Sequence, residues 1–336
     1  MKPSDFAIRL TQFFSAYLPA QRALSPNTIK AYRDAFTLLL RYCRDQRALP
    51  PEKLTLDALD VPLLLAFLDY LQSARRCCAR TRNHRLSALH AFFRYLQTEE
   101  PDRILQCQQI LAIPLQRSAP PPVHYLSREE LTALLSQPNL TTRQGRRDAV
   151  LLRLLYDSGA RAQELVDTCV RDVRLDAPAQ IQLTGKGRKT RIVPLLSNTV
   201  ELLKGYLCEH RLNGAECADS PLFFNRRGER LSRSGIRYIL DKYAQQARSE
   251  ALLGPTGISP HWLRHAKAMH LLQSGNPPPV IQAILGHADI RTTNIYAQAD
   301  TEMKRRALEK AASATSPSPP LSWQEDKSLL NWLRSL

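Results

Sequence analysis

The last third of the chain contains residue types that can cut a phosphate ester without a metal ion. Arginine can bind phosphate through two parallel hydrogen bonds and stays charged at neutral pH. Histidine can move protons near neutral pH, and a tyrosine close to a base can attack phosphorus. These types cluster in one stretch: His261, Arg264, His265, His287 and Tyr296. The cluster predicts cleavage of a phosphate ester, with the tyrosine as the candidate attacking group.

A second arginine upstream is a candidate partner for this cluster, since fixed donors aimed at the charge that develops on a phosphate are usually the largest catalytic term. Arg161 follows Gly159 and Ala160 at the start of an expected helix, 103 residues before Arg264. Only the fold can bring the two arginines together. His261 lies three residues before Arg264, which places both side chains on one face of a helix.

Composition points to a polyanionic partner. The 336 residues contain 47 Lys and Arg against 31 Asp and Glu, which gives a net charge of +16 and a pI near 9.8. Nucleic acid is the first candidate partner and an anionic membrane surface the second. Arginines recur in every region, so a long DNA footprint fits better than a single basic tail. A hydrophobic fraction of 43% is sufficient for folded cores.

The sequence contains no metal or cofactor motif. Its seven cysteines are irregularly spaced without a C-x-x-C pair, which argues against zinc and favours free thiols in a reducing cytosol. There is no Walker A pattern, no apolar signal segment behind Met1, and no apolar run near ~18 residues. We therefore expect a cytoplasmic protein that needs no cofactor, no metal and no membrane.

Residues 1–113 read as an all-helical domain. Expected helices are Asp5–Tyr17, one opening at Ser25-Pro26, Val61–Ser73, and one from about Arg80 to Gln97. Serine is a good helix cap, and proline suits the first helical turn. A Pro-rich linker, 114–122, follows and marks the domain boundary, since consecutive prolines cannot continue a helix.

The second domain, 123–312, reads as mixed α and β. Ser127 and Glu130 form a capping-box signature, and a helix is expected from Arg147 to Ser158. Around 180–195 the hydrophobic period changes to two, which predicts a β-hairpin turning at Gly185-Lys186-Gly187. The remainder to about 312 reads as helical. The expected fold class is mainly α with a small β-sheet.

Residues 313–336 read as a Ser/Pro tether and a terminal helix. Trp332 shares an apolar stripe with Leu329, Leu333 and Leu336. So short a helix cannot bury its own stripe, so it must dock on its own domain or on a neighbouring protomer.

On these motifs the chain resembles the tyrosine recombinases of the phage integrase, Xer and Cre type. The gap of 23 residues from Arg264 to His287 and of nine from His287 to Tyr296 match the spacing of that family. Trp262 is bulkier than the usual residue, and Pro277-Pro278-Pro279 replaces an ordinary helix cap. The resemblance covers nearly the whole chain, and neither departure removes a catalytic group.

The resemblance implies a role for each site residue. Tyr296 is the nucleophile, Arg161 and Arg264 bind phosphate, and Lys186 protonates the leaving oxygen, with Lys189 as its rival. The remaining implied roles are general base for His261, phosphate binding for His287, orientation of Arg161 by Glu164, and support of the site by His265.

The resemblance also implies a reaction and its partners. A 3′-phosphotyrosine forms, and strands then exchange through a Holliday junction without ATP. The partners are double-stranded DNA with inverted-repeat core sites, a homotetramer formed on two DNA sites through the terminal helix, and possible accessory proteins. The N-terminal half resembles the core-binding (SAM-like) domain of the family. Expected DNA contacts are Thr28, Lys30, Arg33, Arg80, Arg82, Asn83 and Arg85, with Arg233 and Arg237 in the catalytic domain.

Two other functions share some of these features. A type IB topoisomerase-like enzyme would nick and close DNA as a monomer, and the trailing helix argues against it. A DNA-binding relative without activity would not need the full set of catalytic residues. The added tail and the divergence from shorter Xer proteins favour integration or transposition of a mobile element over dimer resolution.

Overall fold

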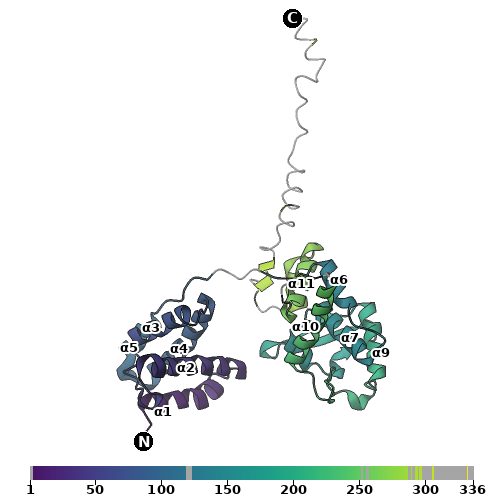
Figure 1. Cartoon of the computed structure of the whole chain (residues 1–336). Helices are drawn as coiled ribbons and strands as arrows, with labels where there is room; N and C mark the ends of the chain where they lie inside the picture. The colour runs from purple at the N-terminus through teal and green to yellow at the C-terminus, as the bar shows by residue number, and fades with distance from the viewer. Residues whose placement is uncertain are drawn as a thin grey trace. The chain divides into compact units, whose positions relative to one another are not determined.

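The helices expected before the proline-rich segment are present in a computed structural model of the chain (Figure 1). It describes residues 3–118, 123–250, 253–254, 257–286, 289, 292–293, 295–296, 305 and 331, and for Lys186 the backbone alone. The chain divides into two units, residues 1–121 and 122–336. The expected tether and terminal helix, 313–336, lie outside the described residues except for position 331.

The regular elements in the described part of the first unit are all helices. Its helices are α1 (Asp5–Gln12), the π-helix η1 (Phe13–Gln21), α2 (Pro26–Arg47), α3 (Val61–Ser73), α4 (Ala79–Glu99) and α5 (Ile104–Leu111), with short 3₁₀ turns η2 (Pro51–Lys53) and η3 (Pro101–Arg103).

Helix starts in this unit follow the expected caps. The Ser25 hydroxyl accepts a hydrogen bond from the Thr28 amide at 3.3 Å, and Pro26 occupies the first turn of α2. The prediction for α3 is confirmed at both ends. The first helix extends beyond Tyr17 by continuing as a π-helix, whose wider turn brings Phe13 and Leu18, five residues apart, into the core.

An aromatic cluster forms the centre of the first unit. Phe92 of α4 lies edge-to-face with Phe13 at 5.2 Å and with Phe36 at 5.3 Å between ring centroids. Such pairs add about 0.5–1.5 kcal/mol each beyond the burial of their surface. The apolar stripe of α4 is buried at every position: Leu86, Leu89, Phe92, Phe93 and Leu96.

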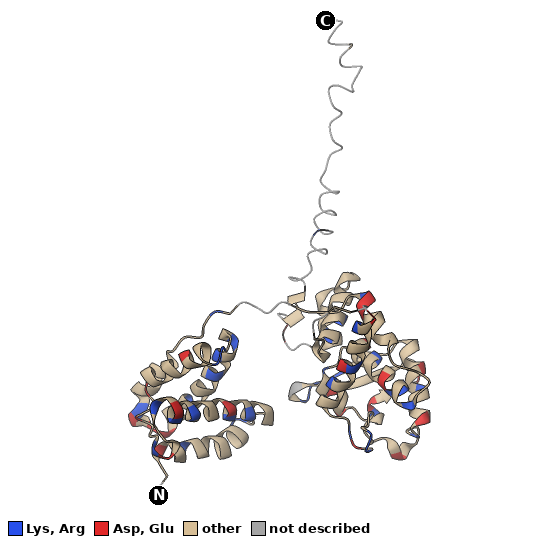
Figure 2. Cartoon of the chain, in the orientation of Figure 1, with Lys and Arg blue, Asp and Glu red and all other residues tan. Residues whose placement is uncertain are grey.

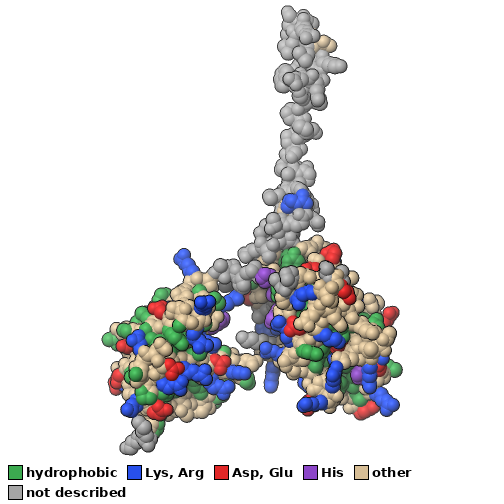
Figure 3. All heavy atoms as spheres, in the orientation of Figure 1, with side chains coloured by type: hydrophobic (Ala, Val, Ile, Leu, Met, Phe, Trp, Pro, Cys, Tyr) green, Lys and Arg blue, Asp and Glu red, His purple; other side chains and the backbone are tan. Residues whose placement is uncertain are grey.

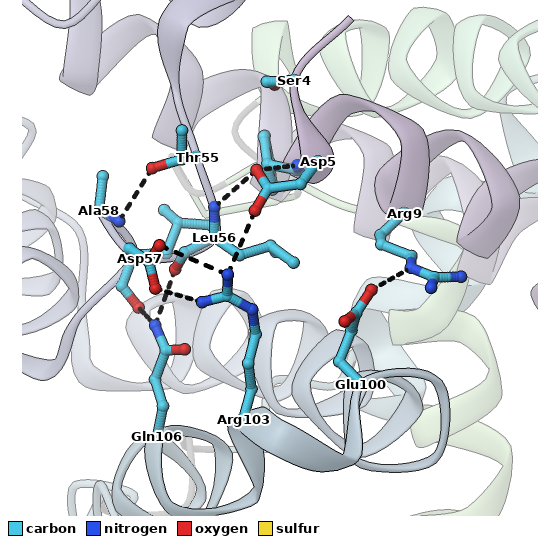
Figure 4. A network of polar contacts seen from close by, with 12 residues as sticks. Ser4, Asp5, Arg9, Thr55, Leu56, Asp57, Ala58, Glu100, Arg103 and Gln106 are labelled. Carbon is cyan, nitrogen blue, oxygen red and sulfur yellow. Dashed lines mark hydrogen bonds and ion pairs between the residues drawn. The ribbon is translucent and has the colours of Figure 1, made fainter.

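A polar network ties the first and last helices of this unit to the loop before α3 (Figure 4). Asp5 Oδ1 accepts from the Leu56 amide at 3.0 Å, and Arg103 pairs with Asp5 and Asp57. Gln106 donates to the Leu56 carbonyl at 2.7 Å. These partly exposed ion pairs contribute at most about 1 kcal/mol each, so they fix geometry more than stability.

The second unit contains seven α-helices and one three-stranded sheet in the part that the structure describes. The elements are α6 (Arg128–Ser136), α7 (Arg143–Asp157), α8 (Ala162–Asp167), η4 (Val170–Asp172), β1 (Val173–Arg174), β2 (Gln180–Thr184), η5 (Lys186–Arg188), β3 (Thr190–Pro194), α9 (Ser197–Glu209), η6 (Ala215–Cys217), α10 (Arg233–Ser249), α11 (Pro260–Gln273) and α12 (Pro278–Leu285).

Local signals placed several of these elements correctly. The capping box of Ser127 and Glu130 is present at the start of α6. Helix α7 ends at Asp157, next to the predicted end, and Gly159 follows with a positive φ of 57°. It begins at Arg143, earlier than expected, because the Thr142 hydroxyl accepts from the Gly145 amide.

The predicted hairpin is formed by β2 and β3, which pair antiparallel with Ile181 opposite Val193 and Leu183 opposite Arg191. The short strand β1, which the sequence did not predict, pairs with the other edge of β2. Ile181, Leu183 and Val193 are buried, so one face of this small sheet packs on the core.

The expectation of helix throughout the rest of the domain is wrong for residues 210–232. Apart from η6, this stretch is irregular and is held by isolated bridges between Cys169 and Pro221 and between Phe224 and Arg230. Asn225 accounts for one reversal, because its side-chain oxygen accepts from the amides of Arg227 and Glu229. Side-chain bonds of this kind favour a turn over a helix.

Helix α7 forms the centre of the second unit and packs against α9, α11 and α6. Its residues Leu151, Leu152, Leu154 and Leu155 are all buried. Because α7 is enclosed, its C-terminal end, where Gly159 leads to Arg161, is held in a defined place. No helix in the described part of the chain is both long and apolar enough to cross a membrane.

Candidate active site

Arg264 connects two helix ends at the base of the site. It lies in α11, which begins at Pro260, and its residue is 3% exposed. One Nη atom donates to the Gly159 carbonyl at 2.6 Å and the other to the Leu285 carbonyl at 2.7 Å. Burial and the charges of Arg161 and Arg191 lower the pKa of Arg264 to about 10, so it remains protonated at neutral pH.

Arg161 is held by a buried carboxylate at the start of α8. Glu164 Oε1 accepts from Arg161 Nη1 at 2.6 Å, and Oε2 accepts from the Arg161 amide at 2.9 Å. Arg191, from β3, donates to Oε2 of the same carboxylate at 2.7 Å. Burial raises the pKa of Glu164, but the bonds from Arg191 and Arg161 outweigh it and hold that pKa below its ordinary value.

The hairpin turn lies beside this pair. A Cβ atom on Gly185 would lie 2.9 Å from Glu164 Oε1 and 3.7 Å from Arg161 Nη1, so the backbone approaches both groups closely. Lys186 follows Gly185 directly, which brings its backbone next to the arginine. Lys189 is exposed at the end of the turn. The described atoms are therefore compatible with either lysine as the proton donor.

Tyr296 is buried beside α11, with its residue 2% exposed. Its hydroxyl lies 2.8 Å from His265 Nδ1, so the hydroxyl donates when the imidazole proton is on Nε2. Burial lowers the pKa of His265 to about 4, and the His261 and Arg264 charges act in the same direction. Burial raises the pKa of Tyr296, which the Arg264 and Arg161 charges oppose.

A cleft of about 490 Å³ opens beside Arg161 and His261. It is lined from three directions, by the start of α8, the start of α10 and the start of α11. Partial burial, and then the charges of Arg264 and Arg161, lower the pKa of His261. The cleft brings together four of the predicted site residues: Arg161, Arg233, Arg237 and His261.

His287 lies outside the described residues, so its position relative to the cleft stays a prediction. Trp262, the bulky departure from the family pattern, stacks on His124 with ring centroids 5.1 Å apart. It therefore points to the start of the second unit and leaves His261 at the cleft. Among the described residues, no group of three or more His, Cys, Asp or Glu side chains converges as a metal site.

The DNA contacts expected in the first unit fall into two groups. Lys30, Arg33 and Arg80 are exposed, while Thr28 and Arg85 are partly exposed and bond within the unit, to Ser25 Oγ and the Ala31 carbonyl. Lys and Arg residues are distributed over the helices of both units among fewer acidic residues (Figure 2), and many of them reach the surface drawn in Figure 3.

Arg82 and Asn83 hold the proline-rich segment. Arg82 is 5% exposed and its Nη1 lies 3.5 Å from the Pro114 carbonyl, so it is removed from the candidate DNA contacts. Its position on the inner face of α4 explains the burial. Asn83 donates to the Gln116 carbonyl at 2.7 Å and accepts from the Gln116 amide at 3.0 Å, which occupies both ends of its amide.

Arg191 is a site residue that the sequence did not single out. It shares the inward face of β3 with the buried Val193, and a charge on such a face must find a buried partner. The alternation of Arg191 and Val193 along the strand was the sequence signal that could have identified Arg191 as a site residue. The partner, Glu164, is 27 residues away and could not be identified without the fold.

Comparison with known proteins agrees with this geometry. The Phage integrase family matches residues 124–303, and the Phage integrase N-terminal SAM-like domain matches residues 11–100. The putative integrase/recombinase y4rC of Sinorhizobium fredii is 38% identical over 337 aligned residues, covering 100% of this chain and 99% of that protein. Tyrosine recombinase XerC of Pelobacter propionicus is 32% identical over 314 residues, covering 91% and 96%.

A solved structure shares both units' folds. The XerH site-specific recombinase bound to its difH substrate, in a pre-cleavage complex, matches with a TM-score of 0.65 and 26% identity, covering 85% of this chain and 79% of that one. The family match spans more than half of the chain and includes the whole arginine, histidine and tyrosine site. The chain therefore belongs to the phage integrase family of tyrosine recombinases and is a site-specific recombinase that breaks and rejoins DNA.

Proposed function

We propose that Tyr296 is the nucleophile of this recombinase, that Arg161 and Arg264 bind the phosphate that it attacks, and that His261 is the general base. The observation that carries the proposal is the excess of positive charge beside Tyr296. The charges of Arg264 and Arg161 both act on Tyr296, and the charge of Arg191 acts on Arg264. Glu164 is the carboxylate partner of Arg161 and Arg191. Such a site favours an anion, and most strongly one that gains charge in the transition state.

The reaction conserves the number of phosphate ester bonds. Tyr296 Oη attacks phosphorus, the bond to the 5′-oxygen breaks, and a 3′-phosphotyrosine is left with a free 5′-hydroxyl. The 5′-oxygen receives a proton from Lys186 or Lys189. A 5′-hydroxyl from a partner duplex then reverses the step, which exchanges strands through a Holliday junction without ATP.

We assign the two histidines near Tyr296 different tasks. His265 Nδ1 accepts a hydrogen bond from the Tyr296 hydroxyl, which holds the ring of the nucleophile in place. His261 lines the cleft and is the general base. Its lowered pKa keeps it neutral, and therefore able to accept a proton, until a negative phosphate enters. His287 completes the phosphate site in this proposal.

Strand exchange between two duplexes cuts four strands, and each cut uses one tyrosine. We infer that four protomers assemble on two inverted-repeat core sites in the cytoplasm, with the terminal helix, 322–336, docking on a neighbour. The difH-bound XerH recombinase supports double-stranded DNA as the substrate. Exposed Lys30, Arg33 and Arg80, with Arg233 and Arg237 at the cleft, are the proposed phosphate contacts.

Integration or transposition of a mobile element is the proposed role, supported by the 38% identical putative integrase/recombinase. Resolution of chromosome dimers is the second candidate, supported by the XerC relative at 32% identity. Matched substrates separate them: one duplex carries sites from the DNA flanking the gene, and the other carries the host's chromosomal dimer-resolution site.

The test of the chemistry is a suicide substrate. Duplexes nicked near candidate sites are incubated with the full chain in EDTA, and a covalent protein–DNA band is sought on a denaturing gel. The wild type should form the band, and Tyr296→Phe should bind the same duplex without forming it. A band that persists in Tyr296→Phe would overturn the assignment. A wild type that relaxes supercoiled DNA as a monomer without recombining two sites would favour a topoisomerase-like enzyme.

A further inference from the structure

Arg191 connects three parts of the catalytic unit that are distant in the sequence. From β3, its Nη2 donates to Glu164 Oε2 at 2.7 Å, and its Nε donates to the Ile284 carbonyl at 2.9 Å. Glu164 belongs to α8 and holds Arg161, and Ile284 belongs to the last turn of α12. One guanidinium group therefore joins the hairpin to both helices.

The arrangement is enclosed. The side chain of Arg191 is 9% exposed and that of Glu164 is 3% exposed. Gly286 follows α12 with φ at +66°, and a Cβ there would lie 2.7 Å from Arg191 Cδ. A buried charge is tolerated only when it is paired and hydrogen-bonded, which both acceptors provide.

Two arginines hold consecutive carbonyls at the end of α12. Arg191 binds the carbonyl of Ile284, and Arg264 binds that of Leu285. Positive groups are favourable at this negative end of a helix dipole. His287 follows two residues later in the sequence. The segment that carries this predicted phosphate ligand thus leaves the helix at a point that both guanidinium groups secure.

The two carboxylate oxygens of Glu164 bind different partners. Oε1 binds the Arg161 side chain, while Oε2 binds Arg191 and the Arg161 amide. Without Arg191, Oε2 loses its charged partner. Oε2 would then most directly bind the Arg161 guanidinium as well, in a bidentate ion pair. That pair would draw the guanidinium of Arg161 away from a phosphate in the cleft.

We propose that Arg191 is a positioning residue for strand cleavage, which aligns Arg161 through Glu164 and the segment leading to His287 through the Ile284 carbonyl. The proposal rests on the phosphate-binding roles given to Arg161 and His287 above. The planar fork of Arg191 serves both contacts at once, since the two acceptors lie on different helices and a lysine at position 191 would offer only one nitrogen to both.

Arg147 provides a matched control in the same unit. It too is a buried arginine that binds a carboxylate, Asp148 at 2.6 Å, and a backbone carbonyl, that of Phe224 at 3.0 Å. Its side chain is 11% exposed, close to the value for Arg191. Among the described residues its hydrogen bonds and ion pair go to Asp148 and Phe224, and none goes to Glu164 or α12. A purely structural role would make the two arginines behave alike.

The experiment compares Arg191→Gln, Arg191→Lys and Arg147→Gln. Covalent complex formation is measured in single turnover with saturating protein, on a nicked duplex that the wild type cleaves. Loss of a charged hydrogen bond predicts a rate about 10- to 100-fold lower for Arg191→Gln, with unchanged DNA affinity. Arg191→Lys should recover part of that rate. Arg147→Gln should lower the unfolding temperature and leave the cleavage rate of the folded protein unchanged.

A sulfur-substituted duplex separates Arg191 from the proton donor on the same hairpin. A 5′-thiolate leaves without being protonated. A 5′-bridging phosphorothiolate should therefore restore the cleavage rate of whichever variant, Lys186→Ala or Lys189→Ala, has lost the proton donor. It should not restore Arg191→Gln, whose defect lies at the phosphate. Full rescue of Arg191→Gln by sulfur, or equal rate losses in Arg191→Gln and Arg147→Gln, would overturn the proposal.

Hydrogen–deuterium exchange supplies a readout that needs no DNA. Arg191→Gln should speed exchange in α8 and at the end of α12 and leave α9 unchanged, whereas Arg147→Gln should not affect α8 or α12. Unchanged exchange at α8 and α12 in Arg191→Gln would overturn the proposal even if no substrate is cleaved. If the wild type cleaves but Tyr296→Phe cleaves too, the proposed function fails while the exchange result still decides the role of Arg191.

Discussion

Replacement of Glu164 by glutamine tests the charge balance of the site most directly. The substitution keeps the shape of the side chain and removes a carboxylate that is 3% exposed and bound by Arg161 and Arg191. The amide nitrogen would then face one guanidinium group. Breaking a buried ion pair from one side costs about 3–5 kcal/mol, because the remaining charge stays buried without its partner.

The expected loss of stability in Glu164→Gln can be measured as a shift of the melting temperature. For a unit of this size, each kcal/mol shifts the midpoint by about 2–4 °C, so Glu164→Gln should unfold about 6–20 °C below the wild type at pH 7. The measurement is the thermal unfolding of the full chain, followed by calorimetry so that two transitions can be separated. Glu201→Gln, on the exposed face of α9, is the matched control and should shift the midpoint by less than about 2 °C.

The pH dependence gives a second check. The pKa of Glu164 is held below its ordinary value of 4.5 in the folded protein. A lowered carboxyl pKa contributes stability that is present above the unfolded-state value and is lost as the pH falls through the folded-state value. The difference between wild type and Glu164→Gln should therefore be constant above about pH 5 and shrink below about pH 4.5. A midpoint within about 2 °C of the wild type at pH 7, or a difference that grows in acid, would refute this reasoning.

Three further substitutions test other parts of the structure. His265→Phe removes the Nδ1 atom that accepts from Tyr296, so single-turnover cleavage should fall about 10-fold or more with unchanged DNA binding; an unchanged rate would exclude a role for this contact. Gly286→Ala places a Cβ against Arg191 at a positive φ, so urea unfolding should show a free energy of unfolding about 1–3 kcal/mol lower. Gly205→Ala is the control and should not lower the free energy of unfolding, because a Cβ there meets nothing within 4 Å. Ser127→Ala removes the capping box of α6 and should lower the free energy of unfolding by about 0.5–2 kcal/mol in the same assay. An unchanged free energy of unfolding would mean that Glu130 alone caps the helix.

The sequence by itself determined the features that depend on neighbouring residues. Ser25 and Ser127 predicted where two helices begin, because a serine hydroxyl caps backbone amides two or three residues further along the chain. Alternation around Gly185 predicted the hairpin, and the spacing of Arg264, His287 and Tyr296 indicated the family. Each of these signals lies within a few turns of chain or in a pattern that the family shares.

The tertiary structure decided which charges meet. Arg161 and Arg264 lie near enough for their charges to interact, because α7 and α11 pack together and present the Gly159 carbonyl to Arg264. Arg82 was predicted to face DNA, yet the packing of the segment around Pro114 on α4 buries it. Arg191 carried no motif, and its role depends on Glu164 and Ile284, which lie 27 and 93 residues away. Burial and partner choice for a charge are set by the whole fold, so no local pattern could reveal them.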